Sequence, residues 1–182
     1  MILTLSSQQM LQVWRKAAGL EPYLDSCSVE SFDGIDVNSR LTTLMRRWYL
    51  ALLDDAPPAL LAPPSDASSL VTLGPVRAGR AALLTDSSVR RLISVRLSSW
   101  QRPATVLAAS EAKAAIAMLD NPYCTAGPVS PLAWRDAAGV VCVSPAADGD
   151  TLAEASAIID PGDDCYILDE LALASVPDDI VL

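Results

Sequence analysis

The period of the hydrophobic pattern changes once along this chain, and the change coincides with its most proline-rich segment. Between residues 39 and 53, apolar residues recur at spacings of three and four, as on one face of an α-helix. Residues 89–100 instead alternate in polarity, as in a strand with one buried face. The intervening segment 56–69 contains four prolines, which favour extended backbone. We therefore expect an α+β fold, with two N-terminal helices followed by a mainly antiparallel sheet and one or two further short helices.

The same features predict the organisation of the chain. A helical N-terminal part would span residues 1–55, a proline-rich linker or wrap 56–69, and a mixed β-rich part 70–182. All three are also compatible with a single domain, because 182 residues can enclose one hydrophobic core. Hydrophobic residues make up 51% of the chain and charged residues 19%, which excludes global disorder.

Local signals place the two N-terminal helices. Ser6 and Gln9 form a capping-box pattern, and Gly19 fits the position just after the helix end. Residues 20–38 have the composition of irregular surface, and Asn38 or Ser39 would cap a second helix that runs to about residue 53. The expected apolar faces are Met10, Val13, Trp14 and Ala17 in the first helix, and Leu41, Leu44, Met45, Trp48 and Leu52 in the second.

The β-rich part contains one strong strand and several shorter signals. In the strand 89–100, Val89, Ile93, Val95 and Leu97 are expected on one side, and Arg90, Ser94, Arg96 and Ser98 on the other. Residues 76–84 suit either a strand or a helix. The remaining expectations are strands at 70–73 and 103–107, a helix at 110–119 ended by Asn121-Pro122, a hairpin at 132–144, a type II turn at 160–163 between strands 155–159 and 165–168, and a short helix at 170–175 capped by Asp169.

The chain has no histidine, and this absence removes the usual general base near neutral pH together with the commonest transition-metal ligand. Its four cysteines have no C-x-x-C spacing and are expected to be buried thiols. The two-glycine segment 74–80 matches neither a Walker loop nor a dinucleotide fingerprint, so we interpret it as a turn. We expect no cofactor, and we favour a protein that is not an enzyme.

Two acidic clusters are candidate calcium ligands. Asp148 and Asp150 form one, and Asp160, Asp163 and Asp164 form the other. Calcium needs six to eight converging oxygens, and the spacing of the EF-hand loop is not met. Aspartates in such positions more often cap turns, so no metal site is expected.

Arginines on the strand 89–100 are candidates for a nucleic-acid-binding surface. No aromatic residues interleave with Arg90, Arg91 and Arg96, so base stacking is not supported. We interpret them as solvated charges that protect a sheet edge. If the protein instead binds a small molecule or a protein partner, the candidate binding residues are Arg90, Arg91, Arg96, Arg102, Asp160, Asp163 and Asp164.

Charge is distributed unevenly along the chain, whose net charge is −9. Residues 1–102 carry 11 basic and 9 acidic groups, whereas residues 103–182 carry 2 basic and 13 acidic groups. Within 74–102, six arginines face a single aspartate. Unlike charges could meet inside one molecule or between molecules, where a head-to-tail contact would generate rings or filaments. The overall acidity disfavours nucleic acid and anionic membranes as partners.

These observations favour a non-catalytic structural or protein-interaction subunit that self-assembles or binds a protein partner, as in a bacterial or bacteriophage assembly. The alternative is a small-molecule-binding protein or an enzyme that uses carboxylates and arginine. The first residues do not resemble a signal peptide, and no run of eighteen apolar residues occurs. A cytoplasmic location is expected, or the virion for a phage component, and the apolar residues 180–182 are expected to dock on a surface.

Overall fold

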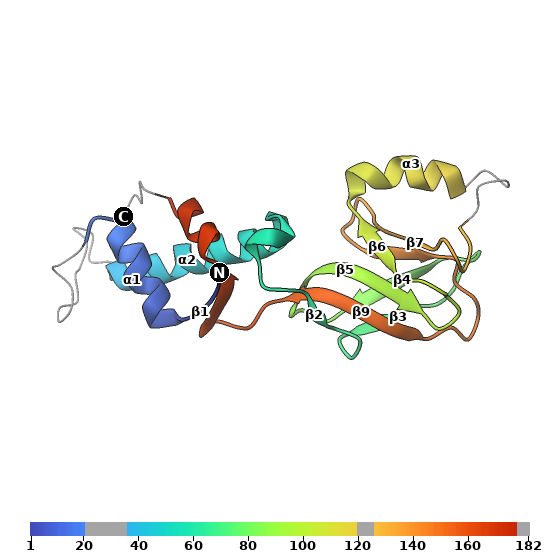
Figure 1. Cartoon of the computed structure of the whole chain (residues 1–182), viewed down its shortest axis with the longest axis horizontal. Helices are drawn as coiled ribbons and strands as arrows, with labels where there is room; N and C mark the ends of the chain where they lie inside the picture. The colour runs from blue at the N-terminus through green and yellow to red at the C-terminus, as the bar shows by residue number, and fades with distance from the viewer. Residues whose placement is uncertain (21–35, 120–125, 178–182) are drawn as a thin grey trace. The chain divides into compact units, whose positions relative to one another are not determined.

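The computed structural model describes residues 1–20, 36–119 and 126–177, which form two compact units (Figure 1). Unit 1 comprises residues 1–63 and 160–182, and unit 2 comprises residues 64–159. The first boundary falls inside the proline-rich segment, between Pro63 and Pro64. At the second boundary the chain returns to unit 1, so its last strand and helix lie with the N-terminal helices rather than with the large sheet.

Unit 1 combines helices with a two-stranded sheet. Its elements are β1 (Ile2–Ser6), α1 (Ser7–Ala17), α2 (Val37–Asp55), the 3-10 helix η1 (Pro58–Leu60), β10 (Cys165–Asp169) and the 3-10 helix η2 (Glu170–Ser175). β1 and β10 pair antiparallel although they come from opposite ends of the chain. The sequence did not predict β1, whereas the short helix capped by Asp169 is confirmed, because the Asp169 carboxylate accepts a hydrogen bond from the Leu171 N–H.

The first helix is confirmed at both ends. The Ser6 hydroxyl accepts from the Gln9 N–H, and the Gln9 side chain accepts from the Ser6 N–H, which completes the capping box. At the other end Gly19 has a φ of +67°, and its N–H donates to the Lys16 carbonyl. Leu20 donates to the Arg15 carbonyl, so the helix ends in a Schellman motif that requires the left-handed conformation of glycine.

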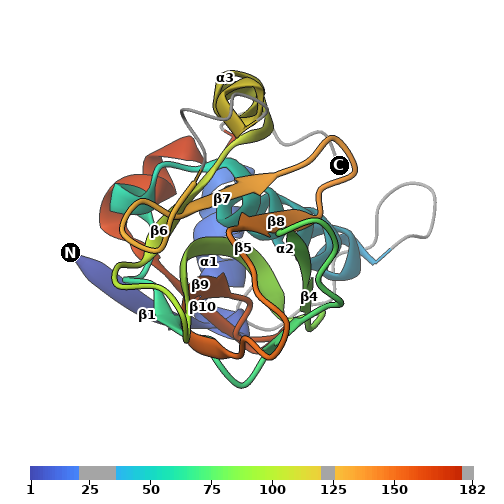
Figure 2. The same cartoon turned by 90° about the vertical axis from the view of Figure 1, so that its right-hand side faces the viewer.

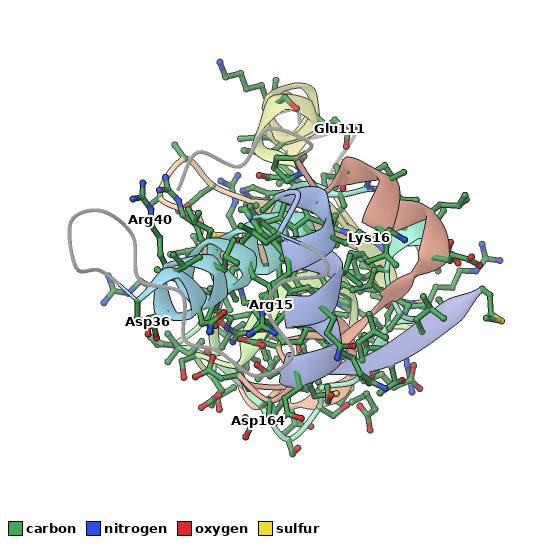
Figure 3. The ribbon with its side chains drawn as sticks, turned by 90° about the vertical axis from the view of Figure 1, so that its left-hand side faces the viewer. Arg15, Lys16, Asp36, Arg40, Glu111 and Asp164 are labelled. Atoms are coloured by element: carbon green, nitrogen blue, oxygen red, sulfur yellow. The ribbon has the colours of Figure 1, made fainter. Side chains whose placement is uncertain are left out.

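The second helix is confirmed, but its predicted cap is wrong. Asp36 precedes α2 and accepts from the Asn38 N–H and the Ser39 hydroxyl. Hydrogen bonds from Ser39 and Asn38 therefore hold the pKa of the Asp36 carboxyl below its usual value. The Asn38 side chain instead accepts two hydrogen bonds from Arg15 of α1, at 2.8 and 3.2 Å, and ties the two helices together. Figure 3 labels Arg15 on α1 and Asp36 at the start of α2.

The buried face of α2 is wider than the predicted stripe. Leu41, Met45 and Leu52 are buried as expected, but Tyr49 and Leu53 are buried as well. Tyr49 packs edge-on against Tyr166 of β10, with ring centroids 4.8 Å apart. A strand from the far end of the sequence thus covers a second side of the helix, which the local pattern does not reveal.

Unit 2 contains one eight-stranded sheet with the order β2-β9-β5-β6-β7-β8-β4-β3. Only β6 and β7 pair in parallel, so the predicted class, α+β with a mainly antiparallel sheet, is confirmed. The sheet curls so that β5 and β9 face β4, β7 and β8 across one shared core (Figures 1 and 2). The strands are β2 (Ser65–Asp66), β3 (Val71–Leu73), β4 (Ala81–Thr85), β5 (Val89–Leu97), β6 (Ala104–Leu107), β7 (Leu132–Arg135), β8 (Val141–Ser144) and β9 (Leu152–Ile159).

The alternation predicted for β5 is interrupted by bulges. Leu92, Val95 and Leu97 are buried, whereas Ile93 is only half-buried. The register pairs Leu92 with Ala157 and then Ser94 with Ser156, so Ile93 is an extra residue that shifts the inward parity. The prediction that Ile93 shares the inward side with Val95 is therefore wrong.

The interpretation of β5 as an edge strand is wrong at Ser94 and Val95, where strands pair on both sides, whereas among the described residues Arg90 and Arg91 lie where β9 is the one strand partner. β9 pairs with β5 along most of its length, and β6 pairs with it on the other side at Ser94 and Val95.

The ambiguous segment 76–84 forms a turn followed by β4, and the hairpin of β7 and β8 is confirmed. The expected helix 110–119 is α3 (Ala109–Leu119), which packs against β7 through a face that includes the buried Ala112. The expected stop at Asn121-Pro122 and the tail 180–182 lie outside the described residues, as does most of the segment 20–38.

Gly74, in the turn between β3 and β4, is expected to be the least replaceable glycine of the described chain. A Cβ at this position would lie 2.8 Å from the backbone oxygen of Ala82, which also accepts the Gly74 N–H. We expect Gly74→Ala to lower the free energy of unfolding by about 1–3 kcal/mol, because strand backbone has to shift. Gly127→Ala is the matched control, since nothing lies within 4 Å of its Cβ and its φ is not positive. Urea denaturation of both variants tests this, and equal stabilities would contradict it.

Candidate functional site

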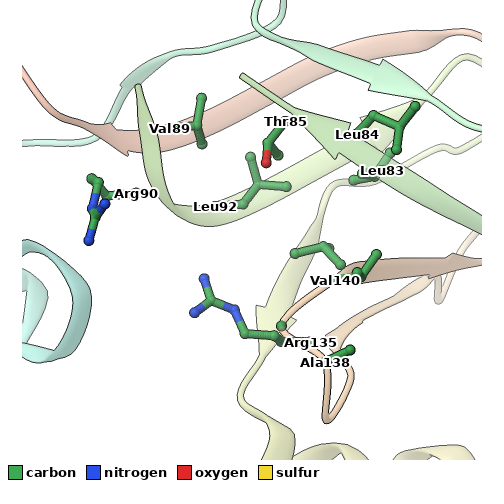
Figure 4. A pocket seen from close by; sticks show the side chains of 11 residues that line it. Leu83, Leu84, Thr85, Val89, Arg90, Leu92, Arg135, Ala138 and Val140 are labelled. Carbon is green, nitrogen blue, oxygen red and sulfur yellow. The ribbon is translucent and has the colours of Figure 1, made fainter. Parts of the chain in front are cut away.

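The candidate site is an open pocket of about 430 Å³ on unit 2 (Figure 4). The end of β4 and the start of β5, which are consecutive in the chain, line it together with the hairpin of β7 and β8, which is distant in sequence. Its lining residues are Leu83, Leu84, Thr85, Val89, Arg90, Leu92, Arg135, Ala138, Gly139, Val140 and Val141. Most of these are aliphatic, and the two arginines are the only ionisable members.

The pairing of the strands explains why the sheet opens here. β6 pairs with β5 only at Ser94 and Val95, so from Val89 to Leu92 β5 has β9 as its one strand partner among the described residues. β4 pairs with β8 only as far as Leu83 and Val141. The ends of these strands diverge, and the gap between them is lined by side chains instead of a backbone ladder.

One wall of the pocket is rigid. Asp136 follows Arg135 at the start of the hairpin turn, and its carboxylate accepts from the N–H groups of Ala138 and Val140 at 2.8 and 2.9 Å. The Asp136 N–H donates to the Val140 carbonyl, and Gly139 takes a φ of +84° that glycine adopts readily. The position of Val140 is thus fixed before any ligand arrives.

The pocket combines positive charge with exposed apolar surface. In Figure 4 the guanidinium groups of Arg90 and Arg135 lie toward one side, and Leu84 and Val140 toward the other. Leu84 is 61% exposed and Val140 38%. Within the described chain no carboxylate forms an ion pair with Arg135. A ligand that fits this arrangement carries a carboxylate or another anion next to an aliphatic group.

Of the candidate arginines, only Arg90 lines this pocket. Arg91 and Arg96 follow on β5, and Arg96 forms an ion pair with its cross-strand neighbour Glu154 on β9. Arg102 is exposed in the turn before β6. The pair of Arg96 and Glu154 shows that the basic segment meets the acidic half of the chain, at least once, inside one molecule.

The candidate aspartates belong to unit 1, whereas the candidate arginines belong to unit 2. Asp160 and Asp163 both pair with Arg46 of α2, and Asp160 also accepts from the Gly162 N–H. Asp164 has an exposed side chain, and its carbonyl accepts from the Ser7 N–H. The Asp160 and Asp163 carboxylates and the Asp164 backbone carbonyl thus anchor the turn before β10 to the helices, which is a structural role.

Among the described residues, the acidic side chains and the Cys142 thiol do not form a catalytic or metal-binding cluster. Asp150 accepts from Ala147, Ser98 and Ser99, and closes a loop of unit 2. No group of three or more described acidic or cysteine side chains has a geometry that could hold a metal ion. Burial raises the pKa of the Cys142 thiol, which therefore stays protonated near neutral pH.

Sequence reasoning missed Arg135, Leu84 and Val140. Arg135 had one signal, since it is the only arginine among residues 103–182. It was assigned to a hairpin strand, which is correct but does not show what the strand end faces. The two aliphatic residues carry no signal, because nothing in their local sequence distinguishes an exposed strand position from a buried one.

The distribution of charge between the units differs from its distribution along the sequence. Unit 2 contains eight basic and eight acidic residues, whereas unit 1 contains five basic and fourteen acidic ones. The net charge of −9 therefore belongs to unit 1, and unit 2 is balanced.

No protein-family model, curated protein or solved structure matches this chain. Every helix in the described residues is too short or too polar to span a bilayer.

Proposed function

We propose that this protein is a non-catalytic structural subunit that assembles with copies of itself. The supporting observation is a pair of unlike surfaces. The pocket of unit 2 joins Arg90 and Arg135 to exposed aliphatic side chains, and the acidic unit 1 exposes aliphatic side chains of its own at Ile2 and Leu171. Exposed apolar groups next to opposite charges favour association through two different surfaces.

The chemistry of the pocket favours binding over catalysis. Both of its ionisable side chains are guanidinium groups, which stay charged at all physiological pH values and cannot act as general acids or bases there. The lining contains no carboxylate, thiol or amine that could serve as a nucleophile. The Thr85 hydroxyl has no general base in the lining to activate it, so a pocket of this kind is suited to fixing the position of an anionic partner rather than transforming it.

Sedimentation velocity over a range of protein concentrations, in low and in high salt, tests the proposal. We expect larger species to appear as concentration rises, and to be less populated in high salt because unlike charges are screened. A monomer at every concentration and salt would overturn self-assembly.

A second candidate function is the binding of a small amphiphilic carboxylate. The favouring observation is the volume of about 430 Å³, which lies in the range of roughly 300–1,000 Å³ typical of ligand pockets. Calorimetric titration with octanoate distinguishes the two. Saturable one-to-one binding by a protein that stays monomeric would favour the small ligand, whereas absence of binding by a self-associating protein would favour the structural subunit.

A further inference from the structure

A small exposed surface on unit 1 has the properties that the pocket on unit 2 requires. It consists of Ile2, Glu170 and Leu171, and we refer to it as the knob. Leu171 is 71% exposed and Ile2 43%, and Glu170 is exposed as well. The three are neighbours because Ile2 pairs with Asp169 across the sheet, and the Glu170 N–H donates to the Met1 carbonyl at 2.9 Å.

The backbone of the knob is held in place. The Asp169 carboxylate accepts from the Leu171 N–H at 3.0 Å and fixes the first turn of η2. Ala172 is fully buried, and the indole N–H of Trp48 donates to the Ser175 carbonyl, so η2 is anchored on α2. A surface fixed in this way loses little conformational entropy when it binds.

The knob and the pocket are complementary in charge and in polarity. No described basic side chain forms an ion pair with Glu170, just as no described carboxylate pairs with Arg135. Each of these charges shares its surface with exposed aliphatic side chains: Leu171 and Ile2 on the knob, and Leu84 and Val140 in the lining of the pocket. Large exposed hydrophobic side chains of the described chain occur at the knob with Met1, at the pocket, and at Val129.

We propose that the knob of one copy docks in the pocket of a second copy, with Glu170 paired to Arg135 and Leu171 packed against Leu84 and Val140. This inference rests on the proposed function and specifies the surfaces through which assembly occurs. Because the two surfaces differ, the contact is heterologous. Each copy keeps one free knob or one free pocket after a single contact, so assembly continues into a ring or a filament.

The test mixes two variants, each defective in one surface. Arg135→Glu places a negative charge in the pocket, and Leu171→Glu places one on the knob. Both positions are solvent-accessible, so each variant is expected to fold, and circular dichroism checks this. Val140→Glu is a second pocket variant if Arg135→Glu does not fold. Val129→Glu is the matched control, because Val129 is 53% exposed on unit 2 but does not line the pocket.

By sedimentation velocity we expect each single variant to associate at least tenfold more weakly than the wild type, and Val129→Glu to be unchanged. An equimolar mixture of the pocket and knob variants should form a dimer and nothing larger, since each pair has one intact knob and one intact pocket. Self-association of the single variants at the wild-type level would overturn the knob-and-pocket contact but leave self-assembly intact. Failure of the mixture to dimerise would also overturn it. A monomeric wild type would overturn the proposed function itself.

Discussion

Replacing Tyr49 by phenylalanine is expected to lower the free energy of unfolding of unit 1 by about 2–4 kcal/mol, although the change removes a single oxygen atom. The Tyr49 hydroxyl donates to the Ile167 carbonyl at 3.2 Å and accepts from the Ile167 N–H at 3.0 Å. It therefore acts toward β10 as a neighbouring strand would. Without it, both backbone groups lose their partner beside a fully buried ring.

Tyr166→Phe is the matched control for this prediction. Tyr166 belongs to the same edge-on ring pair, but its hydroxyl bonds to the Ser7 side chain and not to backbone. Removing the Tyr166 hydroxyl should lower the free energy of unfolding by less than about 1 kcal/mol. Urea denaturation measures both variants, and hydrogen exchange should show faster opening at Ile167 in Tyr49→Phe alone. Equal losses in the two variants would mean that the contacts to Ile167 do not matter to stability.

The same hydroxyl predicts a response to alkaline pH. Burial raises the pKa of Tyr49 to about 12, above the value of about 10 expected in the unfolded chain. The folded state thus favours the neutral phenol, so its contribution to stability is complete below about pH 10 and is lost as the pH rises toward 12. Tyr49→Phe should lack this part of the alkaline loss. Burial also raises the pKa of Tyr166, so the stability of Tyr49→Phe should still depend on alkaline pH, but less steeply than that of the wild type.

Features that depend on a few adjacent residues could be predicted from the sequence. The capping box of Ser6 and Gln9, the turn at Gly19 and the hairpin around Asp136 are each determined by contacts within about six residues. The change of hydrophobic period gave the fold class for the same reason. These patterns are local, and tertiary packing did not override them.

Features that depend on contacts between distant residues could not be predicted from the sequence. β1 pairs with β10 across almost the whole chain, and no local pattern at the first residues indicates that partner. The bulge at Ile93 reverses the side on which the following residues point, and it is specified by pairing with β9. Asp36 was overlooked as a cap because Asn38 and Ser39 have equally good cap chemistry, and only the contact with Arg15 shows that Asn38 is used elsewhere.

The candidate site belongs to this second kind. Three segments contribute to the pocket: the sequence predicts β5 and the hairpin of β7 and β8, but leaves residues 76–84 open between a strand and a helix. What the sequence lacks is the relation among them, since the opening exists because β5 loses β6, and β4 loses β8, as a ladder partner beside the pocket. The charge pattern of the sequence is enough to make Arg90 a candidate, whereas only the folded arrangement of the strands shows that Arg135 lines the pocket.

Arg46→Met is expected to lower the free energy of unfolding by roughly 2–4 kcal/mol, because it leaves a partly buried carboxylate without its main partner. The Arg46 guanidinium pairs with Asp160, whose side chain is 15% exposed, and donates to the Gly162 carbonyl at 3.1 Å. It also lies 5.9 Å from the ring centroid of Tyr49. Methionine keeps the aliphatic stem and removes only the charge and the donors. Urea denaturation and hydrogen exchange in β10 measure the effect.

The second partner of Arg46 provides the control. Asp163 lies 2.7 Å from Arg46, but its side chain is 86% exposed, so solvent screens the interaction. Asp163→Asn should therefore cost less than about 0.5 kcal/mol, while Asp160→Asn should cost several times more. The double variant Arg46→Met/Asp160→Asn should be more stable than the sum of the single losses predicts, because removing both charges leaves neither one buried alone. Strict additivity of the two losses, or equal losses at Asp160 and Asp163, would show that burial of the Asp160 carboxylate is not what makes Arg46 necessary.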